Sequence, residues 1–275
     1  MRINFLHRVI SSTICHIYVR ISNKKCAASS YDSSHETQLM QLVVLTTGAV
    51  RRRYLVEKLQ ARFPIARVLV ETRDPPPPYP TAHPLDNARK TRERDNWYDG
   101  NPPTFESIAD VQSFENLNEP EAVDQLQDLK PDVLLVFGTG RLSEAVLRQC
   151  PAGSINFHNG DAEEYRGLDC HLWPLFHGDF DALRMTMHKI EPALDTGTII
   201  DRRPVPLRHG MPLSDLRRAA TELTVEMALD ALDAFQKNGA FAATPQVRSG
   251  RYYSYIPAVL KDTCIRKFAR HTATL

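Results

Sequence analysis

The chain has 275 residues, of which 42% are hydrophobic and 24% are charged, and its formal net charge is +1. This length and composition suit one large α/β domain, or one domain with small additions, and provide enough apolar residues for a substantial core. The nearly neutral charge argues against a nucleic-acid or membrane-surface binder, and no apolar run is long enough to cross a bilayer.

The five cysteines are odd in number and scattered, and no CxxC pair occurs. Disulfide frameworks and structural zinc sites need paired or closely spaced cysteines, so we expect neither of them. We predict a protein without a metal site in a reducing, cytoplasmic location. The oligomeric state stays open, a homodimer included.

Residues 1–40 differ in composition from the rest of the chain. Basic residues precede the first acidic residue, Asp32, and serines are frequent. One interpretation is an organelle transit peptide, and the other is a disordered tail or a start codon placed too far upstream. We prefer the second because the apolar residues form no clean amphipathic face.

The next segments predict a βαβ unit. Leu42–Gly48 reads as a buried strand ending in a tight turn, Arg51–Arg62 as a helix, and Ala66–Thr72 as a second strand. This order implies a right-handed crossover and a parallel sheet. We interpret Asp74–Pro103, which is rich in proline, as an insertion or mobile flap, with a solvated helix over Ala88–Tyr98.

The α/β alternation then resumes up to about residue 210. Beyond it a long amphipathic helix is expected, capped by Ser214 and ended by Gly239, followed by an aromatic and basic tail that ends in a helix. We therefore predict an α/β fold with a Rossmann-like, mainly parallel sheet and helices on both faces. Residues 41–210 form the catalytic domain in this prediction, and 211–275 a C-terminal helix and tail. The other expected elements are helices at 121–129 and 142–150, the latter with Ser143 as N-cap, and strands at 132–137, 153–158, 184–190 and 197–207.

Three polar residues follow or end these strands. Asn156 and His158 stand two residues apart at a strand end, so both side chains point to one side, where ligands bind in open α/β sheets. A carboxamide can stabilise a developing oxyanion, and an imidazole can transfer protons near neutral pH. Asp195, in the turn "LDTG", is the candidate that would orient the imidazole.

The ordered segments "PDVLLVFGTGRL", "GSINFHNG", "EYRGLDCHLWPLFHGD" and "LDTGTII" resemble the folate-dependent formyltransferase family. That family includes glycinamide ribonucleotide transformylase, methionyl-tRNA formyltransferase and the sugar N-formyltransferases. The resemblance implies catalytic roles for Asn156, His158 and Asp195, and 10-formyltetrahydrofolate as co-substrate. It also implies a folate pocket, whose residues would be Phe137, Gly138, Thr139, Gly140, Arg141, Leu142 and Gly167.

The acceptor is less defined, because many family members have H-P-S-L-L-P where this chain has "HNGDAEEYRG". We expect a small-molecule amine, either a nucleotide-linked amino sugar or another phosphorylated amine, and a bound phosphate would suit the basic start of the first helix. The candidate substrate-binding residues are Thr47, Gly48, Arg51, Arg52 and Arg53. A solvated basic patch is the alternative interpretation. The architecture is most similar to that of sugar N-formyltransferases, and the short, modestly basic C-terminal segment argues against tRNA.

Three alternatives remain. A formyltetrahydrofolate hydrolase would use the same residues with water as acceptor. A non-catalytic folate-fold protein would bind a ligand or partner, although a degenerate member would be free to lose one of the three polar residues. A nicotinamide-dependent dehydrogenase is disfavoured because "TTGAVRRRY" lacks the G-x-G-x-x-G pattern.

Overall fold

The computed structural model describes residues 40–275. The expected leader or tail over residues 1–40 therefore lies, except for Met40, outside the described residues. Leu39–Leu275 form one unit, so the C-terminal segment belongs to the same unit as the sheet.

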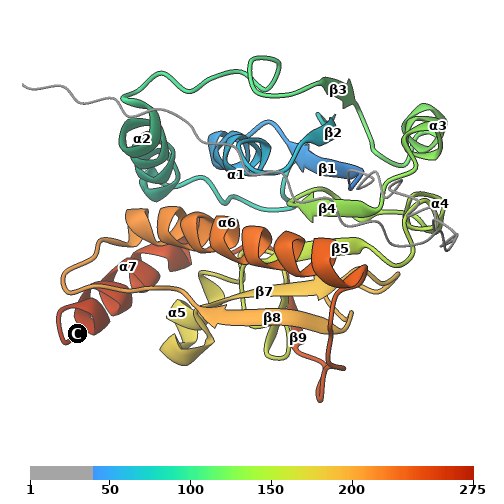
Figure 1. Cartoon of the computed structure of the whole chain (residues 1–275). Coiled ribbons are helices and arrows are strands. Elements are labelled where there is room, and N and C mark those ends of the chain that lie inside the picture. Colours follow the sequence, from blue (N-terminus) through green and yellow to red (C-terminus); the bar gives the residue numbers. More distant parts are fainter. Residues whose placement is uncertain (1–39) are drawn as a thin grey trace, which may run out of the picture. The chain divides into compact units, whose positions relative to one another are not determined.

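A seven-stranded sheet forms the centre of this unit, in the order β3-β2-β1-β4-β5-β7-β8 (Figure 1). Strands β1 to β5 run parallel, and β7 runs antiparallel to both β5 and β8. The strands are β1 (Leu42–Thr47), β2 (Ile65–Glu71), β3 (Val111–Phe114), β4 (Val133–Phe137), β5 (Ser154–His158), β7 (Arg184–Lys189) and β8 (Ile199–Pro204).

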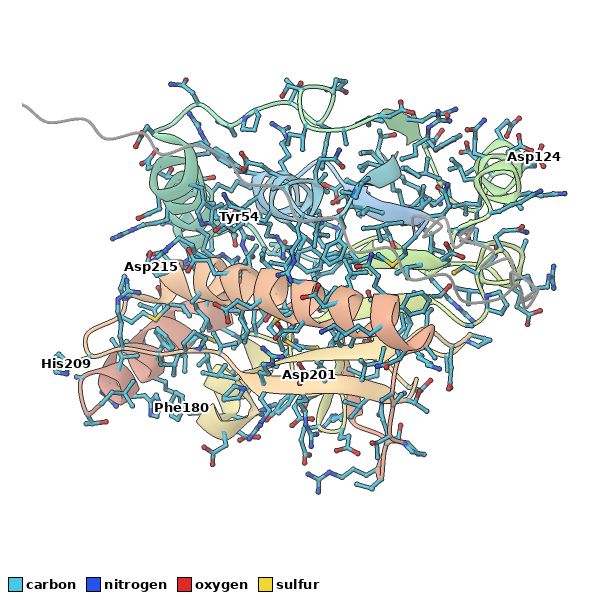
Figure 2. All side chains as sticks on the ribbon, in the orientation of Figure 1. Tyr54, Asp124, Phe180, Asp201, His209 and Asp215 are labelled. Atoms are coloured by element: carbon cyan, nitrogen blue, oxygen red, sulfur yellow. The ribbon has the colours of Figure 1, made fainter. Side chains whose placement is uncertain are left out.

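Helices cover both faces of the sheet, because the side chains of a strand alternate between faces. On β1, Leu42 and Val44 pack in a cluster with α1 and α6, whereas Val43 and Leu45 pack with α3 and α4. Figure 2 shows side chains filling the layer between α6 and the sheet. The mainly parallel sheet with helices on both faces is therefore confirmed. The helices are α1 (Val50–Gln60), α2 (Pro84–Tyr98), α3 (Pro120–Leu129), α4 (Glu144–Leu147) and α6 (Leu213–Asn238).

Smaller elements lie outside the seven-stranded sheet. β6 (Tyr165–Gly167) and β9 (Arg251–Tyr253) form a second, two-stranded sheet, and α5 (Trp173–His177) packs against α7 (Ala258–Thr272). The sequence patterns did not indicate β6, β9 or α5, because three to five residues are too few to show a period. None of the helices between residues 40 and 275 combines the length and apolarity needed to cross a membrane.

Helix α2 differs from the solvated helix expected within Asp74–Pro103. It packs against α1 and α6, and its buried positions are Leu85, Arg89 and Glu93. The sequence pattern did not indicate this buried face of the helix, because two of the three buried residues are charged. Ion pairs make that burial tolerable: Arg89 pairs with Asp86, and Glu93 accepts from Arg217 Nε at 2.5 Å.

The helix ends were predicted with mixed success. Gly239 ends α6 in the left-handed conformation, with φ 69°, as expected. Ser214 as its N-cap is wrong, because the extended Pro212 precedes the first turn and its carbonyl accepts from Asp215 N at 3.0 Å. Ser143 occupies the N-cap position of α4, but its side chain makes no capping hydrogen bond.

Candidate active site

The three predicted catalytic residues lie together where β5 ends. His158 Nδ1 is 3.4 Å from Asp195 Oδ2, and both side chains are buried. Asn156 and His158 alternate with Phe157 on β5, and all three polar residues line one large cleft. The tertiary structure thus brings Asp195 to His158 although the two residues lie far apart along the chain.

Asp195 occupies a tight turn that points its carboxylate inward. Its φ of 55° lies in the left-handed region, which aspartate adopts more often than most non-glycine residues. Oδ2 accepts from the Gly167 amide at 2.8 Å. Burial acts to raise the pKa of Asp195, but His158, His188 and the Gly167 amide together hold that pKa well below its ordinary value. The carboxylate is therefore ionised throughout the physiological range.

The His158 ring lies between two acceptors. Nε2 is 2.6 Å from the Tyr165 carbonyl oxygen, which can only accept, so Nε2 carries a proton. Nδ1 faces Asp195 and is the nitrogen that gains or loses a proton. Burial lowers the pKa of His158, and the Asp195 charge opposes that shift.

A second histidine, His188, completes the group and was not among the predicted site residues. Its Nδ1 donates to the Lys189 carbonyl at 2.8 Å, and its Nε2 lies 3.2 Å from Asn156 Nδ2. His188 Nε2 also lies 3.4 Å from Asp195 Oδ1. The contact with Asn156 orients its carboxamide and leaves the second N–H of that amide for a ligand.

Sequence reasoning missed His188 because its position depends on strand pairing. His188 on β7 lies directly opposite Asn156 on the antiparallel β5, so the two side chains share one face. The same register sets Thr186 opposite His158. No pattern in "RMTMHKI" indicates which strand β7 pairs with, or in which register, so only the folded sheet places His188 at the site.

The cleft beside these residues has a volume of about 1320 Å³. All seven predicted folate-pocket residues line it, namely Phe137 to Leu142 and Gly167. The segment after β4 is held in place by two neighbouring side chains: Glu71 accepts from the Gly140 amide at 2.6 Å, and Arg52 Nε donates to the Phe137 carbonyl at 3.0 Å. Within residues 40–275, no group of three or more His, Cys, Asp or Glu side chains is arranged to hold a metal ion.

The predicted substrate-binding residues divide into two groups. Thr47, Gly48, Arg51 and Arg52 line the cleft. The Arg53 guanidinium instead donates to the Pro103 and Gly48 carbonyls at 3.1 and 3.2 Å, and it is not among the residues that line the cleft.

Positive charge gathers on the side of the cleft formed by α1, α2 and α6. Burial and the neighbouring Arg52 and Arg217 charges lower the pKa of Arg51. Within residues 40–275 the Arg51 guanidinium has no hydrogen-bond or ion-pair partner. Lys90 and Arg217 line the same wall and add to its positive charge. Because arginine stays protonated in proteins, this wall favours an anionic ligand.

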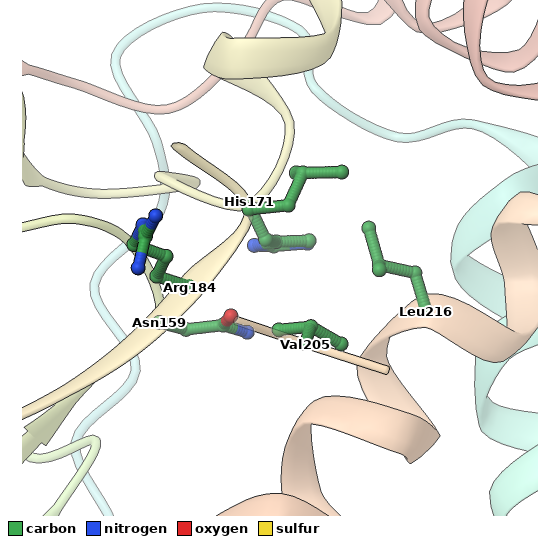
Figure 3. A pocket seen from close by; sticks show the side chains of 6 residues that line it. Asn159, His171, Arg184, Val205 and Leu216 are labelled. Carbon is green, nitrogen blue, oxygen red and sulfur yellow. The ribbon is translucent and has the colours of Figure 1, made fainter. Parts of the chain in front are cut away.

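His171 lies at the edge of this cationic wall, in a small pocket with Asn159, Val205 and Leu216 (Figure 3). Burial and the charges of Arg89 and Arg217 lower its pKa well below the ordinary value of 6.5. Its Nε2 is 2.7 Å from Arg89 Nη1, which can only donate, so the ring is a neutral acceptor.

The neutral His171 predicts a pH-dependent stability. Below pH 6.5 the unfolded chain binds a proton that the folded chain excludes, so stability falls as the pH is lowered, by at most about 1.4 kcal/mol per pH unit. His171→Asn, which keeps an acceptor for Arg89, should lose less stability than the wild type as the pH is lowered from neutral through 6.5. Urea unfolding at several pH values measures this, and parallel curves for the two proteins would contradict it.

The comparison with known sequences agrees with this fold. The sequence profile of the formyl transferase family matches residues 82–232, which is more than half of the chain. The chain therefore belongs to the formyl transferase family, and the matched residues include α2, β5 and the turn of Asp195.

Individual relatives match over part of their length. A methionyl-tRNA formyltransferase of Roseiflexus castenholzii is 35% identical over 133 residues, which cover 48% of this chain and 42% of that protein. One from Legionella pneumophila is 32% identical over 126 residues, covering 46% of this chain and 40% of its own length. The chain thus matches less than half the length of these curated relatives.

Solved structures share the fold at low sequence identity. Glycinamide ribonucleotide transformylase 1 from Symbiobacterium toebii superposes with a TM-score of 0.54 and 17% identity, covering 77% of this chain and 95% of its own. An N-formyltransferase from Helicobacter canadensis, in complex with folinic acid and dTDP-3-aminofucose, superposes with a TM-score of 0.52 and 15% identity. The match covers 78% of this chain and 71% of that protein. These likenesses confirm the expected formyltransferase fold.

Proposed function

We propose that the protein transfers a formyl group from 10-formyltetrahydrofolate to a small amine that carries a phosphate. The observation that carries this proposal is the convergence of the Asn156 carboxamide, the His158 imidazole and the Asp195 carboxylate on one cleft. Family membership supports the reaction class.

The proposed reaction makes separate demands on the three residues. The amine nitrogen attacks the formyl carbon, the bond from that carbon to the folate nitrogen breaks, and one proton passes from the amine to the folate nitrogen. Negative charge develops on the formyl oxygen, where the free N–H of Asn156 is available to stabilise it. The proton transfer is assigned to His158, and Asp195, 3.4 Å from its Nδ1, stabilises its charged form.

The folate would occupy the side of the cleft formed by the segment after β4. Arg52 donates to the Gly138 carbonyl and Glu71 accepts from the Gly140 amide, which fixes this segment, and Leu142 adds an apolar surface to the cleft. The complex of the Helicobacter canadensis relative with folinic acid supports a folate ligand for this fold.

The phosphate of the acceptor would bind at the cationic wall, near the start of α1. There Arg51, whose guanidinium lies over the Phe137 ring, has no hydrogen-bond or ion-pair partner among the described residues, and Thr47 and Gly48 precede the helix N-terminus. Tyr252, which is 53% exposed, and Tyr255 line the same cleft and offer faces for a sugar or base. A nucleotide-linked amino sugar fits this combination, and the relative in complex with dTDP-3-aminofucose supports the same class.

Arg51→Gln should weaken the binding of the acceptor more than the binding of the folate. We expect the KM for the phosphorylated amine to rise about 10- to 100-fold, because a charge-assisted contact to phosphate is worth about 1.5–3 kcal/mol. The KM for 10-formyltetrahydrofolate should change less than about threefold. Arg53→Gln is the matched control, since this neighbouring arginine does not line the cleft. Equal effects of Arg51→Gln on both substrates would defeat the phosphate assignment.

A single assay tests the proposed function against its alternatives. The protein is incubated with 10-formyltetrahydrofolate and with amino sugar nucleotides, glycinamide ribonucleotide, methionyl-tRNA or no amine, and tetrahydrofolate release is followed. We expect turnover with a phosphorylated small amine. Formate release without any amine would identify a hydrolase, and folate binding without turnover would identify a binding protein.

A further inference from the structure

A short segment near the C-terminus contacts the turn that carries Asp195. It lies beyond the residues that the family profile matches, which end at residue 232. The Gln246 Nε2 atom donates to two carbonyls of the turn, those of Asp195 and Gly197, each at 2.9 Å. A primary amide has two N–H groups, so both are used to hold this turn.

The turn has an uncommon backbone conformation that its neighbours help to hold. Asp195 has a φ of 55°, in the left-handed region that few non-glycine residues adopt. The Gly167 amide holds the carboxylate from one side, and Gln246 holds the backbone of the same residue from another. Together they set the direction from which Oδ2 approaches His158 Nδ1.

Gln246 is itself held on both sides along the chain. Thr244 pairs with Ile199 of β8 through two hydrogen bonds of 2.8 Å. The Val247 amide donates to the buried carboxylate of Glu163 at 2.6 Å, and Glu163 is paired with Arg202 at 2.7 Å. Gln246 is therefore fixed to the sheet and to the loop after β5, so that it can restrain the turn.

We propose that Gln246 is a positioning residue, which sets the geometry between Asp195 and His158 without touching substrate. This inference rests on the proposed formyl transfer for its kinetic consequence. Its structural part, the dependence of the Asp195–His158 contact on Gln246, holds for the protein without any substrate.

The kinetic test compares Gln246→Ala and Gln246→Glu with the wild type. Both variants should lower kcat about 10- to 100-fold, because small displacements of a catalytic group have effects of this size. Both KM values should stay within about threefold. The glutamate side chain of Gln246→Glu has nearly the same size as glutamine but presents oxygen to the two carbonyls. A lower kcat in this variant therefore reports the lost hydrogen bonds rather than lost packing. Gln149→Ala is the control, since this half-buried glutamine donates to the Ala145 carbonyl and does not line the cleft.

A second measurement does not depend on turnover. The Asp195 charge raises the pKa of His158, so NMR titration of the His158 ring should show a lower pKa in Gln246→Ala than in the wild type. Wild-type kcat together with an unchanged His158 titration would overturn the inference. A rise in KM with kcat unchanged would also overturn it, because Gln246 would then act on substrate binding. Absence of turnover in the wild type would defeat the proposed function, while the titration would still test the positioning role.

Discussion

Replacement of His158 or Asp195 by alanine should each lower the rate of formyl transfer by about 100-fold or more, which is the effect expected from loss of an acid/base unit. His158 is the group to which we assign the proton transfer, and Asp195 is its buried charged partner at 3.4 Å. Measurement of kcat/KM with the preferred amine tests both variants. Retained activity in Asp195→Ala would remove Asp195 from the catalytic group.

The pH dependence of these proteins separates the two roles. Burial lowers the pKa of His158 below 6.5, and Asp195 opposes this shift, so removal of the carboxylate should lower that pKa further. If His158 acts as the base, the acidic limb of the rate profile in Asp195→Ala should move to lower pH. His209→Ala is a suitable control, because His209 is exposed in the loop before α6 (Figure 2). A shift to higher pH would contradict the charge relation between the two residues.

Replacement of Gly197 by alanine should destabilise the protein and disturb the catalytic turn. A Cβ at this position would lie 2.7 Å from the Lys189 carbonyl carbon and closer still to its oxygen, so the backbone of β7 or of the turn must move. We expect a loss of about 3 kcal/mol in the free energy of unfolding, as for severe overpacking. For a chain of this size that corresponds to a fall in Tm of roughly 6–12 °C.

Gly48→Ala is the matched control for this prediction. No atom lies within 4 Å of the position where its Cβ would stand, and its φ is not in the left-handed region. The control should change the free energy of unfolding by less than about 1 kcal/mol. Equal stability of Gly197→Ala and the wild type in urea would show that the turn can move away from β7 at little cost.

The sequence alone was sufficient for the architecture and for the three polar residues of the site. Continuous apolar runs such as Val133–Phe137 indicate strands buried on both faces, and the alternation of strands with amphipathic segments indicates a parallel sheet. The ordered motifs around Asn156, His158 and Asp195 indicated the family. Each strand, helix and motif is read from residues near one another along the chain, and the family from the order in which the motifs follow one another.

The tertiary structure decided what depends on contacts between distant segments. His188 joins the site because β7 pairs with β5 in one register, and α2 packs inward through Arg89 and Glu93 because ion pairs offset their burial. Arg51 lines the cleft whereas Arg53 bonds the Pro103 carbonyl, and Gln246 donates to the Asp195 carbonyl. These contacts depend on side-chain directions that no local sequence pattern encodes. Side-chain direction and strand register follow from the packing of the whole unit, and for this reason only the folded chain determines them.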